Sequence, residues 1–133
     1  MNDETLQRIS RTYGIENWSA GYFSVNNLGN MIAHPAMNDP RWVDLKNVVD
    51  HLVKDKKLQL PILLRFPQIL TNQLKLLTGS YRDSIEQFGY KAKHFPVFPM
   101  KVNPRREVVE EFLKDTSKYR VGLECGSKAE LYA

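Results

Sequence analysis

One lysine stands where an apolar run meets a predicted helix start. Residues 95–100, Phe-Pro-Val-Phe-Pro-Met, lead into Lys101, and Asn103 and Pro104 follow. A lysine amine becomes nucleophilic at neutral pH when desolvation or a neighbouring cation favours its neutral form, and it can then form a Schiff base with an aldehyde cofactor. Lys101 is therefore the candidate for covalent chemistry. From this segment alone, an ordinary solvent-exposed lysine is the simpler interpretation.

The residues around Lys101 predict a short strand followed by a helix. Aromatic and β-branched residues favour a strand, whereas Pro96 and Pro99 suit a short strand, a strand end or an edge, because proline donates no backbone hydrogen bond. Asn103 is a candidate helix cap, and Pro104 fits the first helical position. We therefore expect Lys101 at, or just past, the C-terminal end of a strand. Parallel α/β folds place their chemistry at that edge.

The composition is that of a globular domain. The 133 residues are 42% hydrophobic and 26% charged. No apolar segment reaches the length of a membrane span, and residues 1–4 lack the basic and apolar regions of a secretory signal. The single cysteine, Cys125, excludes a disulfide within the chain. These observations predict a cytoplasmic protein with no membrane partner.

Several function classes are disfavoured by what the sequence lacks. The net charge of +4 comes from 19 basic and 15 acidic residues that are interspersed. No basic stripe with interleaved aromatic residues is present, so we expect no nucleic-acid partner. No Cys/His cluster has zinc spacing, and no glycine-rich phosphate loop is present. We therefore expect no metal ligands among these residues.

The first half of the chain predicts a hairpin, a helix and a strand. Residues 26–30, Asn-Asn-Leu-Gly-Asn, are flanked by apolar residues and predict a β-hairpin over residues 22–32. Asp44 can cap a helix with apolar residues at helical spacing from Leu45 to Val53. Residues 60–66 form an apolar run that predicts a buried strand with Arg65 at its C-terminal end.

The second half predicts strands alternating with helices. Pro67 can open a long amphipathic helix whose end is marked by Gly89. After the segment of Lys101 and its helix, residues 120–125 predict another short strand, and Ser127 with Glu130 forms a capping box. Such alternation indicates an α/β fold, either a doubly wound parallel sheet or the opening of a (β/α)₈ barrel. Three strands do not close a barrel of about 250 residues, so the chain is either a small open sheet or part of a larger domain.

With these elements in order, several blocks resemble one family. They are Tyr13-Gly14-Ile15 with Asn17-Trp18, Gly21-Tyr22-Phe23 with Val25-Asn26, residues 60–67, Val97-Phe98-Pro99-Met100-Lys101-Val102-Asn103, and Gly122-Leu123-Glu124-Cys125-Gly126-Ser127 with the residues to Leu131. Together they resemble the N-terminal part of the biosynthetic arginine decarboxylases, pyridoxal-phosphate enzymes of the alanine-racemase-like fold, fold type III. The sequence departs from the family pattern at Phe98, Met100 and Pro104, and none of these changes alters the chemistry of Lys101.

The resemblance implies a fold and an activity. Residues 41–133 would be the opening βα units of a (β/α)₈ TIM-type barrel that is incomplete in this chain. Residues 1–40, with the hairpin, would associate with a β-domain. The activity would be decarboxylation of L-arginine to agmatine in polyamine biosynthesis, with Lys101 holding pyridoxal 5'-phosphate as an internal aldimine. The family also suggests Mg²⁺ and a homo-oligomer for the full-length enzyme. We expect the chain to be a fragment that is inactive alone.

Three further residues are candidates for binding the cofactor. Glu124 stands where related decarboxylases keep an acid near the cofactor lysine, although an ordinary strand-end acid is an equal alternative. Arg65 would face the same side as Lys101 and attract a phosphate or carboxylate, or else form a structural salt bridge. His94 is the weakest candidate, for stacking on a pyridine ring. Two other functions stay open: another fold-type III decarboxylase of the ornithine, diaminopimelate or carboxynorspermidine type, and a non-catalytic protein that binds pyridoxal phosphate.

Overall fold

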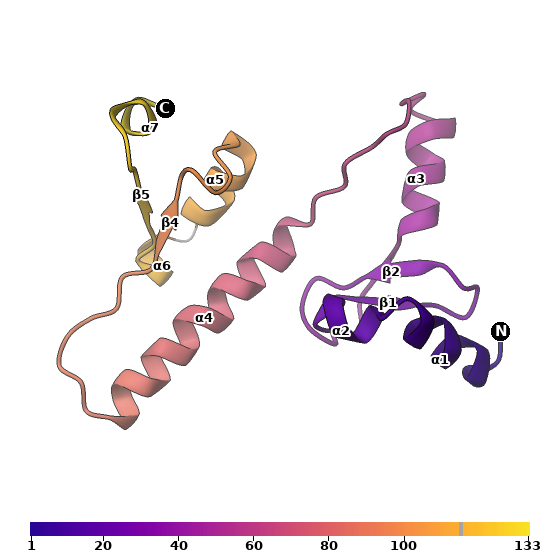
Figure 1. Cartoon of the computed structure of the whole chain (residues 1–133), viewed down its shortest axis with the longest axis horizontal. Coiled ribbons are helices and arrows are strands. Elements are labelled where there is room, and N and C mark those ends of the chain that lie inside the picture. The colour runs from indigo at the N-terminus through magenta and orange to yellow at the C-terminus, as the bar shows by residue number, and fades with distance from the viewer. Residues whose placement is uncertain (115) are drawn as a thin grey trace. The chain divides into compact units, whose positions relative to one another are not determined.

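The computed structural model describes residues 1–114 and 116–133, with the backbone alone at residues 116 and 117. The chain divides into two compact units, Met1–Ile69 and Leu70–Ala133. Figure 1 shows the order of the helices and strands along the chain. No helix in the described ranges is both long enough and apolar enough to cross a membrane.

The first unit contains a three-stranded antiparallel sheet. Its strands are β1 (Phe23–Val25), β2 (Met31–Ala33) and β3 (Val43–Asp44), in the order β1-β2-β3. Helices α1 (Asp3–Thr12) and α2 (Ile15–Ser19) precede the sheet, and α3 (Leu45–Lys54) follows it. The buried apolar side chains of this unit are Ile15, Tyr22, Ile32 and Ala33. Since β2 is the central strand and carries two of them, it is the strand around which the unit packs.

Asn26 organises the turn between β1 and β2. Its side-chain oxygen accepts hydrogen bonds from the backbone N–H groups of Leu28 and Asn30, both at 3.0 Å. Gly29 lies in the left-handed region with φ +82°, which glycine adopts without strain. The Asn26 side chain therefore holds the turn in place through the backbone, and Gly29 supplies the left-handed conformation that the turn needs.

Asp44 begins α3, as its place before the apolar helix pattern predicted. Its Oδ1 accepts a hydrogen bond from the backbone N–H of Asn47 at 3.1 Å. Its Oδ2 accepts from the side-chain amides of Asn26 at 2.8 Å and Asn30 at 2.9 Å. These bonds, with that of Asn30 the largest cause, lower the pKa of Asp44. A single buried carboxylate thus joins the β1–β2 turn to the start of α3.

Residues 60–66 do not form the predicted strand. The segment has no regular secondary structure, and Leu60 and Leu63 are 67% and 69% exposed. A strand needs a hydrogen-bonded neighbour, and Pro61 cannot donate to one. Apolar composition gave this segment strand propensity, but in the described structure it pairs with no strand.

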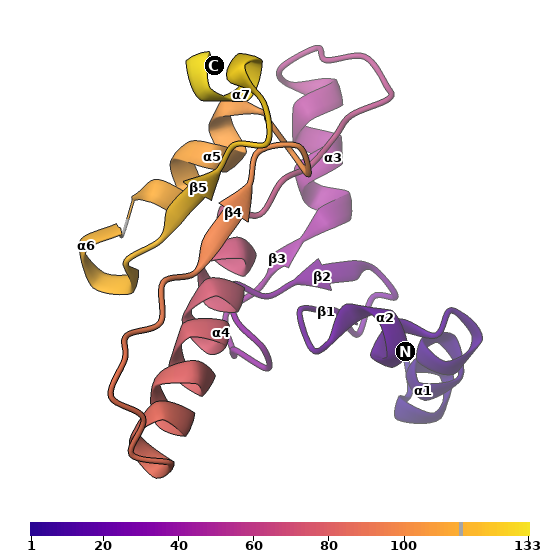
Figure 2. The ribbon, with the colours of Figure 1, turned by 60° about the vertical axis from the view of Figure 1, so that its left-hand side comes forward.

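The second unit begins inside a long helix. Helix α4 (Pro67–Gln87) starts at Pro67, as predicted, and the chain turns beyond its end through Gly89, which has φ +60°. The elements that follow are β4 (Val97–Pro99), α5 (Arg106–Leu113), α6 (Thr116–Tyr119), β5 (Gly122–Glu124) and α7 (Lys128–Tyr132). Figure 2 shows β4 and β5 side by side, and their pairing is parallel.

The parallel pair packs on α5. The rings of Phe98 in β4 and Phe112 in α5 are stacked with centroids 4.2 Å apart. The buried apolar side chains of this unit include Leu74, Met100, Val109 and Val121. Two parallel strands with helices between them occur in open sheets and in barrels alike. The (β/α)₈ assignment, and the division of the chain at residue 40, therefore stay predictions.

Helix α5 starts later than the sequence indicated. Its N-cap is Arg105, without a side-chain capping bond, and the Asn103 side chain instead accepts from the backbone N–H of Arg105 at 3.4 Å. Asn103 and Pro104 therefore belong to the connection before the helix. The extra residues lengthen the loop that carries Lys101.

Candidate functional site

Lys101 lies in a turn immediately beyond β4. The strand ends at Pro99, and the backbone N–H of Val102 donates to the Pro99 carbonyl at 3.1 Å, which closes the turn. Met100 is buried at 6% exposure, while the Lys101 side chain is exposed. Within the described ranges, Lys101 forms no ion pair. Its backbone is therefore held just past a strand end, as predicted, and its exposed side chain is open to a ligand.

Strand register places Glu124 at the same edge. Pro99 is opposite Glu124 in the parallel pair, and the backbone N–H of Met100 donates to the Glu124 carbonyl at 2.9 Å. Both strands therefore end together, with Lys101 two positions beyond the last paired residue of β4. The structure brings Lys101 and Glu124 to one edge, although their side chains form no ion pair with each other.

A second carboxylate approaches this edge from α7. The backbone N–H of Gly126 donates to Glu130 Oε2 at 2.8 Å, and the Ser127 hydroxyl donates to Glu130 Oε1 at 3.3 Å. A Cβ on Gly126 would lie 3.5 Å from Glu124 Oε1 and 3.8 Å from Glu130 Oε2. Sequence reasoning treated Glu130 as a capping residue only. The contact that it missed is the one between the Glu130 carboxylate and the backbone N–H of Gly126.

Ser127 has the capping role that the sequence predicted. Its hydroxyl oxygen accepts from the backbone N–H of Glu130 at 3.2 Å at the start of α7. Cys125 is half-buried and carries a free thiol. Neither residue is positioned by these contacts for a catalytic task.

His94 lies at the other end of β4. It comes before the first strand residue, Val97, whereas Lys101 follows the last. Its imidazole is stacked on the Tyr81 ring of α4, with centroids 4.0 Å apart and planes 13° apart. The structure does not bring His94 together with Lys101, and one face of its ring is already covered.

Arg65 belongs to the first unit, whereas Lys101, Glu124 and His94 belong to the second. Arg65 is exposed on the irregular segment that was expected to be a strand. Its part in a common site with Lys101 therefore stays a prediction.

The donor set suits an aldehyde cofactor better than a metal ion. No group of three or more His, Cys, Asp or Glu side chains that could hold a metal is found in the described part of the chain. In the described part of the chain the Lys101 side chain is exposed, so the desolvation that favours a neutral amine is not present there. Lys101 nevertheless offers a primary amine, the group to which an aldehyde is attached covalently, at the edge that also carries Glu124. Lys101 and Glu124 fit pyridoxal phosphate in this respect. The Mg²⁺ that the resemblance suggested stays a prediction.

Comparison with known proteins identifies relatives along almost the whole chain. The chain is 42% identical over 129 residues to the biosynthetic arginine decarboxylase of Citrifermentans bemidjiense, a match that covers 97% of this chain and 20% of that protein. The protein of the same name from Bacteroides thetaiotaomicron is 42% identical over 128 residues, which is 96% of this chain and again 20% of the relative.

A third relative, the biosynthetic arginine decarboxylase of Rhodopirellula baltica, is 40% identical over 129 residues and is covered to 19% of its length. No family model matches the chain. The chain thus spans about a fifth of the length of the curated relatives it matches. The resemblance recognised from the sequence is confirmed: over nearly its whole length, this chain is similar to one part of the biosynthetic arginine decarboxylases.

Proposed function

We propose that this chain is the part of an arginine decarboxylase that carries the cofactor lysine, and that the enzyme containing it converts L-arginine to agmatine in polyamine biosynthesis. One observation carries the proposal: the lysine of the matched family block lies exposed at the C-terminal edge of a parallel strand pair, the edge at which Glu124 ends the second strand. The names of the relatives supply the reaction.

In this proposal Lys101 is the residue to which pyridoxal phosphate is attached. When bound, that group supplies an aldehyde for the lysine and an electron sink for the bond pair that carbon dioxide leaves behind. Lys101 Nζ would lose its proton before the cofactor is attached. It would become a free amine again when the substrate takes its place on the cofactor. A turn closed by the Pro99 carbonyl holds the Lys101 backbone, so the amine is presented from a fixed point at the edge.

Glu124 would accept or return the proton at Lys101 Nζ. Its carbonyl is anchored by Met100 N–H, one residue before the lysine, so both side chains start from neighbouring backbone positions. A carboxylate near an amine favours the charged form of that amine. The half-buried Glu124 would therefore be the group at this edge that exchanges a proton with the lysine amine.

Attachment is tested in a chimera that joins this chain to the remaining four fifths of the Geobacter sp. relative, of which the chain covers 20%. The chimera is reduced with borohydride in the presence of pyridoxal phosphate and mapped by peptide mass spectrometry. We expect the adduct on Lys101 and its loss in Lys101→Ala. Lys128→Ala, at the start of α7, is the matched control and should keep the adduct.

Turnover is tested by agmatine release from L-arginine by the same chimera. We expect Lys101→Ala to lower kcat by at least about a thousandfold, because the proposal attaches the cofactor through this amine. The 133-residue chain alone should release none. An adduct without agmatine would favour a non-catalytic cofactor-binding protein, and absence of an adduct on Lys101 would defeat both proposals. Cytoplasmic location and homo-oligomeric assembly remain predictions.

A further inference from the structure

A groove of about 660 Å³ runs along α4 in the second unit. Its walls are one face of α4, the segment from Ala92 to His94, and the segment from Lys118 to Arg120. We call it the basic groove, because the charged residues of the described ranges that line it are Lys75, Arg82, Lys93, Lys118 and Arg120, with the acid Asp83. The lysines and arginines come from three separate stretches of the sequence.

Most of these cations have no acidic partner among the residues that the structure describes. Arg82 pairs with Asp83 at 3.5 Å. Lys75, Lys93, Lys118 and Arg120 form no ion pair with any residue of the described ranges. Like charges that converge on one concave surface raise its potential and attract counter-ions of the opposite sign. The basic groove is therefore an electrostatic site for an anion.

The strand pairing explains why these segments meet. Residues 92–94 precede β4 and residues 118–120 precede β5, so the parallel pairing of the two strands puts both segments at the same edge. That edge is opposite the one that carries Lys101. Arg120 is further fixed by its guanidinium, which lies 5.9 Å from the centroid of the Phe95 ring. The groove is thus separate from the site of the proposed reaction.

We propose that the basic groove binds a phosphate-bearing small molecule that carries at least two negative charges. Lysine and arginine side chains are the usual partners of phosphate oxygens. The groove volume is in the range of small-molecule sites. Apolar side chains of Leu76, Ile85 and Ala92 also line it, and they can contact a non-polar part of the ligand.

The probe is inorganic pyrophosphate, titrated into the ¹⁵N-labelled full chain at low ionic strength. Pyrophosphate has no aldehyde, so its binding does not depend on the chemistry of Lys101. We expect saturable shifts of the backbone amide signals of residues 75–82, 92–94 and 118–120. The double variant Lys93→Gln/Lys118→Gln should bind about tenfold more weakly, as expected for the loss of two exposed charge contacts.

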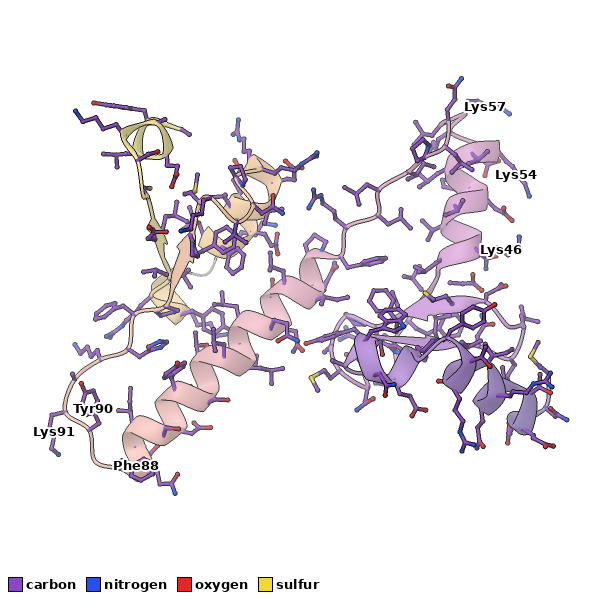
Figure 3. All side chains as sticks on the ribbon, in the orientation of Figure 1. Lys46, Lys54, Lys57, Phe88, Tyr90 and Lys91 are labelled. Carbon is purple, nitrogen blue, oxygen red and sulfur yellow. The ribbon has the colours of Figure 1, made fainter. Side chains whose placement is uncertain are left out.

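The matched control is Lys91→Gln/Lys57→Gln, which removes the same net charge. Lys91 lies on the loop after α4, close to Lys93 in sequence but outside the groove lining, and Lys57 follows α3 in the first unit (Figure 3). The control should keep its affinity within about twofold. The proposal is overturned if no saturable shifts occur, if they cluster around residues 101–106, or if the control binds as weakly as the groove variant.

Discussion

Asp44 and Lys101 are both charged side chains at the end of a strand, yet their surroundings are opposite. Asp44 is 5% exposed and accepts three hydrogen bonds from Asn26, Asn30 and Asn47. Lys101 is exposed and forms no ion pair in the described structure. A polar group whose partners are all supplied by the fold stabilises that fold, and a group left open at a strand edge is free for a ligand. A change at Asp44 should therefore lower the stability of the fold, whereas a change at Lys101 should affect cofactor attachment and leave stability nearly unchanged.

The largest effect on stability is expected at Asp44. Asp44→Ala removes the cap of α3 and leaves the side-chain amides of Asn26 and Asn30 without their acceptor. We expect the midpoint of thermal unfolding to fall by several degrees. Both tryptophans, Trp18 and Trp42, lie in the first unit, so tryptophan fluorescence reports this unit specifically.

Asp44→Asn is the control for the capping bond alone. Asparagine still caps a helix through its oxygen, but it offers fewer acceptor sites to the two amides. Its midpoint should lie between those of the wild type and Asp44→Ala. Equal midpoints for all three proteins would show that this carboxylate does not hold the unit together.

Acid should weaken the first unit. A hydrogen bond from Arg41 lowers the pKa of Asp39 to about 2, and the pKa of Asp44 is lowered chiefly by Asn30. Both carboxyl groups have a lower pKa in the folded than in the unfolded state, so their ionised forms stabilise the fold above about pH 4. This contribution to the free energy of unfolding is lost as the pH falls toward 2, because the carboxylates become protonated.

The pH effect is measured as the tryptophan-detected midpoint between pH 7 and pH 2. Asp39→Asn should lower the midpoint at pH 7, because the ion pair with Arg41 is removed. It should also make the midpoint less dependent on pH, because the variant lacks this ion pair at pH 7 and at pH 2 alike. Asp83→Asn, which changes an exposed acid of the second unit, should leave this dependence unchanged. A wild-type midpoint that does not fall between pH 4 and pH 2 would contradict the prediction.

Local patterns in the sequence were sufficient where the cause is local. The cap at Asp44, the start of α4 at Pro67 and the strand end before Lys101 each depend on residues within one turn or strand. The predicted strand at residues 60–66 was wrong because a strand also requires a neighbour, which apolar composition does not supply. The same limit hid the stacking of His94 on Tyr81, a residue of another element.

The sequence was enough to predict those parts of the candidate site that depend only on where strands end. Lys101 follows the end of β4 and Glu124 ends β5, so parallel pairing alone brings them to one edge. The basic groove could not be predicted, because its cations come from three segments and look scattered along the sequence. Only the pairing of β4 with β5 places residues 92–94 beside residues 118–120.

The second unit has its own counterpart of Asp44, with a smaller expected effect. Thr71 on α4 donates its hydroxyl to Glu111 on α5 at 3.0 Å, which joins the two helices. Thr71→Val should lower the free energy of unfolding by about 1 kcal/mol. Thr78→Val is the control on the same helix, because the Thr78 hydroxyl donates to the Leu74 carbonyl of its own helix. Urea unfolding followed by circular dichroism should detect the first change and little of the second.

The smallest effect on stability is expected at the residue with the largest effect on chemistry. Lys101→Ala removes an exposed side chain that forms no ion pair in the described ranges, so the free energy of unfolding should change by no more than about 0.5 kcal/mol. Urea unfolding of the same variant used for cofactor attachment measures this directly. A loss as large as that of Thr71→Val would mean that Lys101 is held by contacts within the fold. The absence of an adduct in Lys101→Ala could then reflect a disturbed edge, and the contrast with Asp44 would no longer separate chemistry from stability.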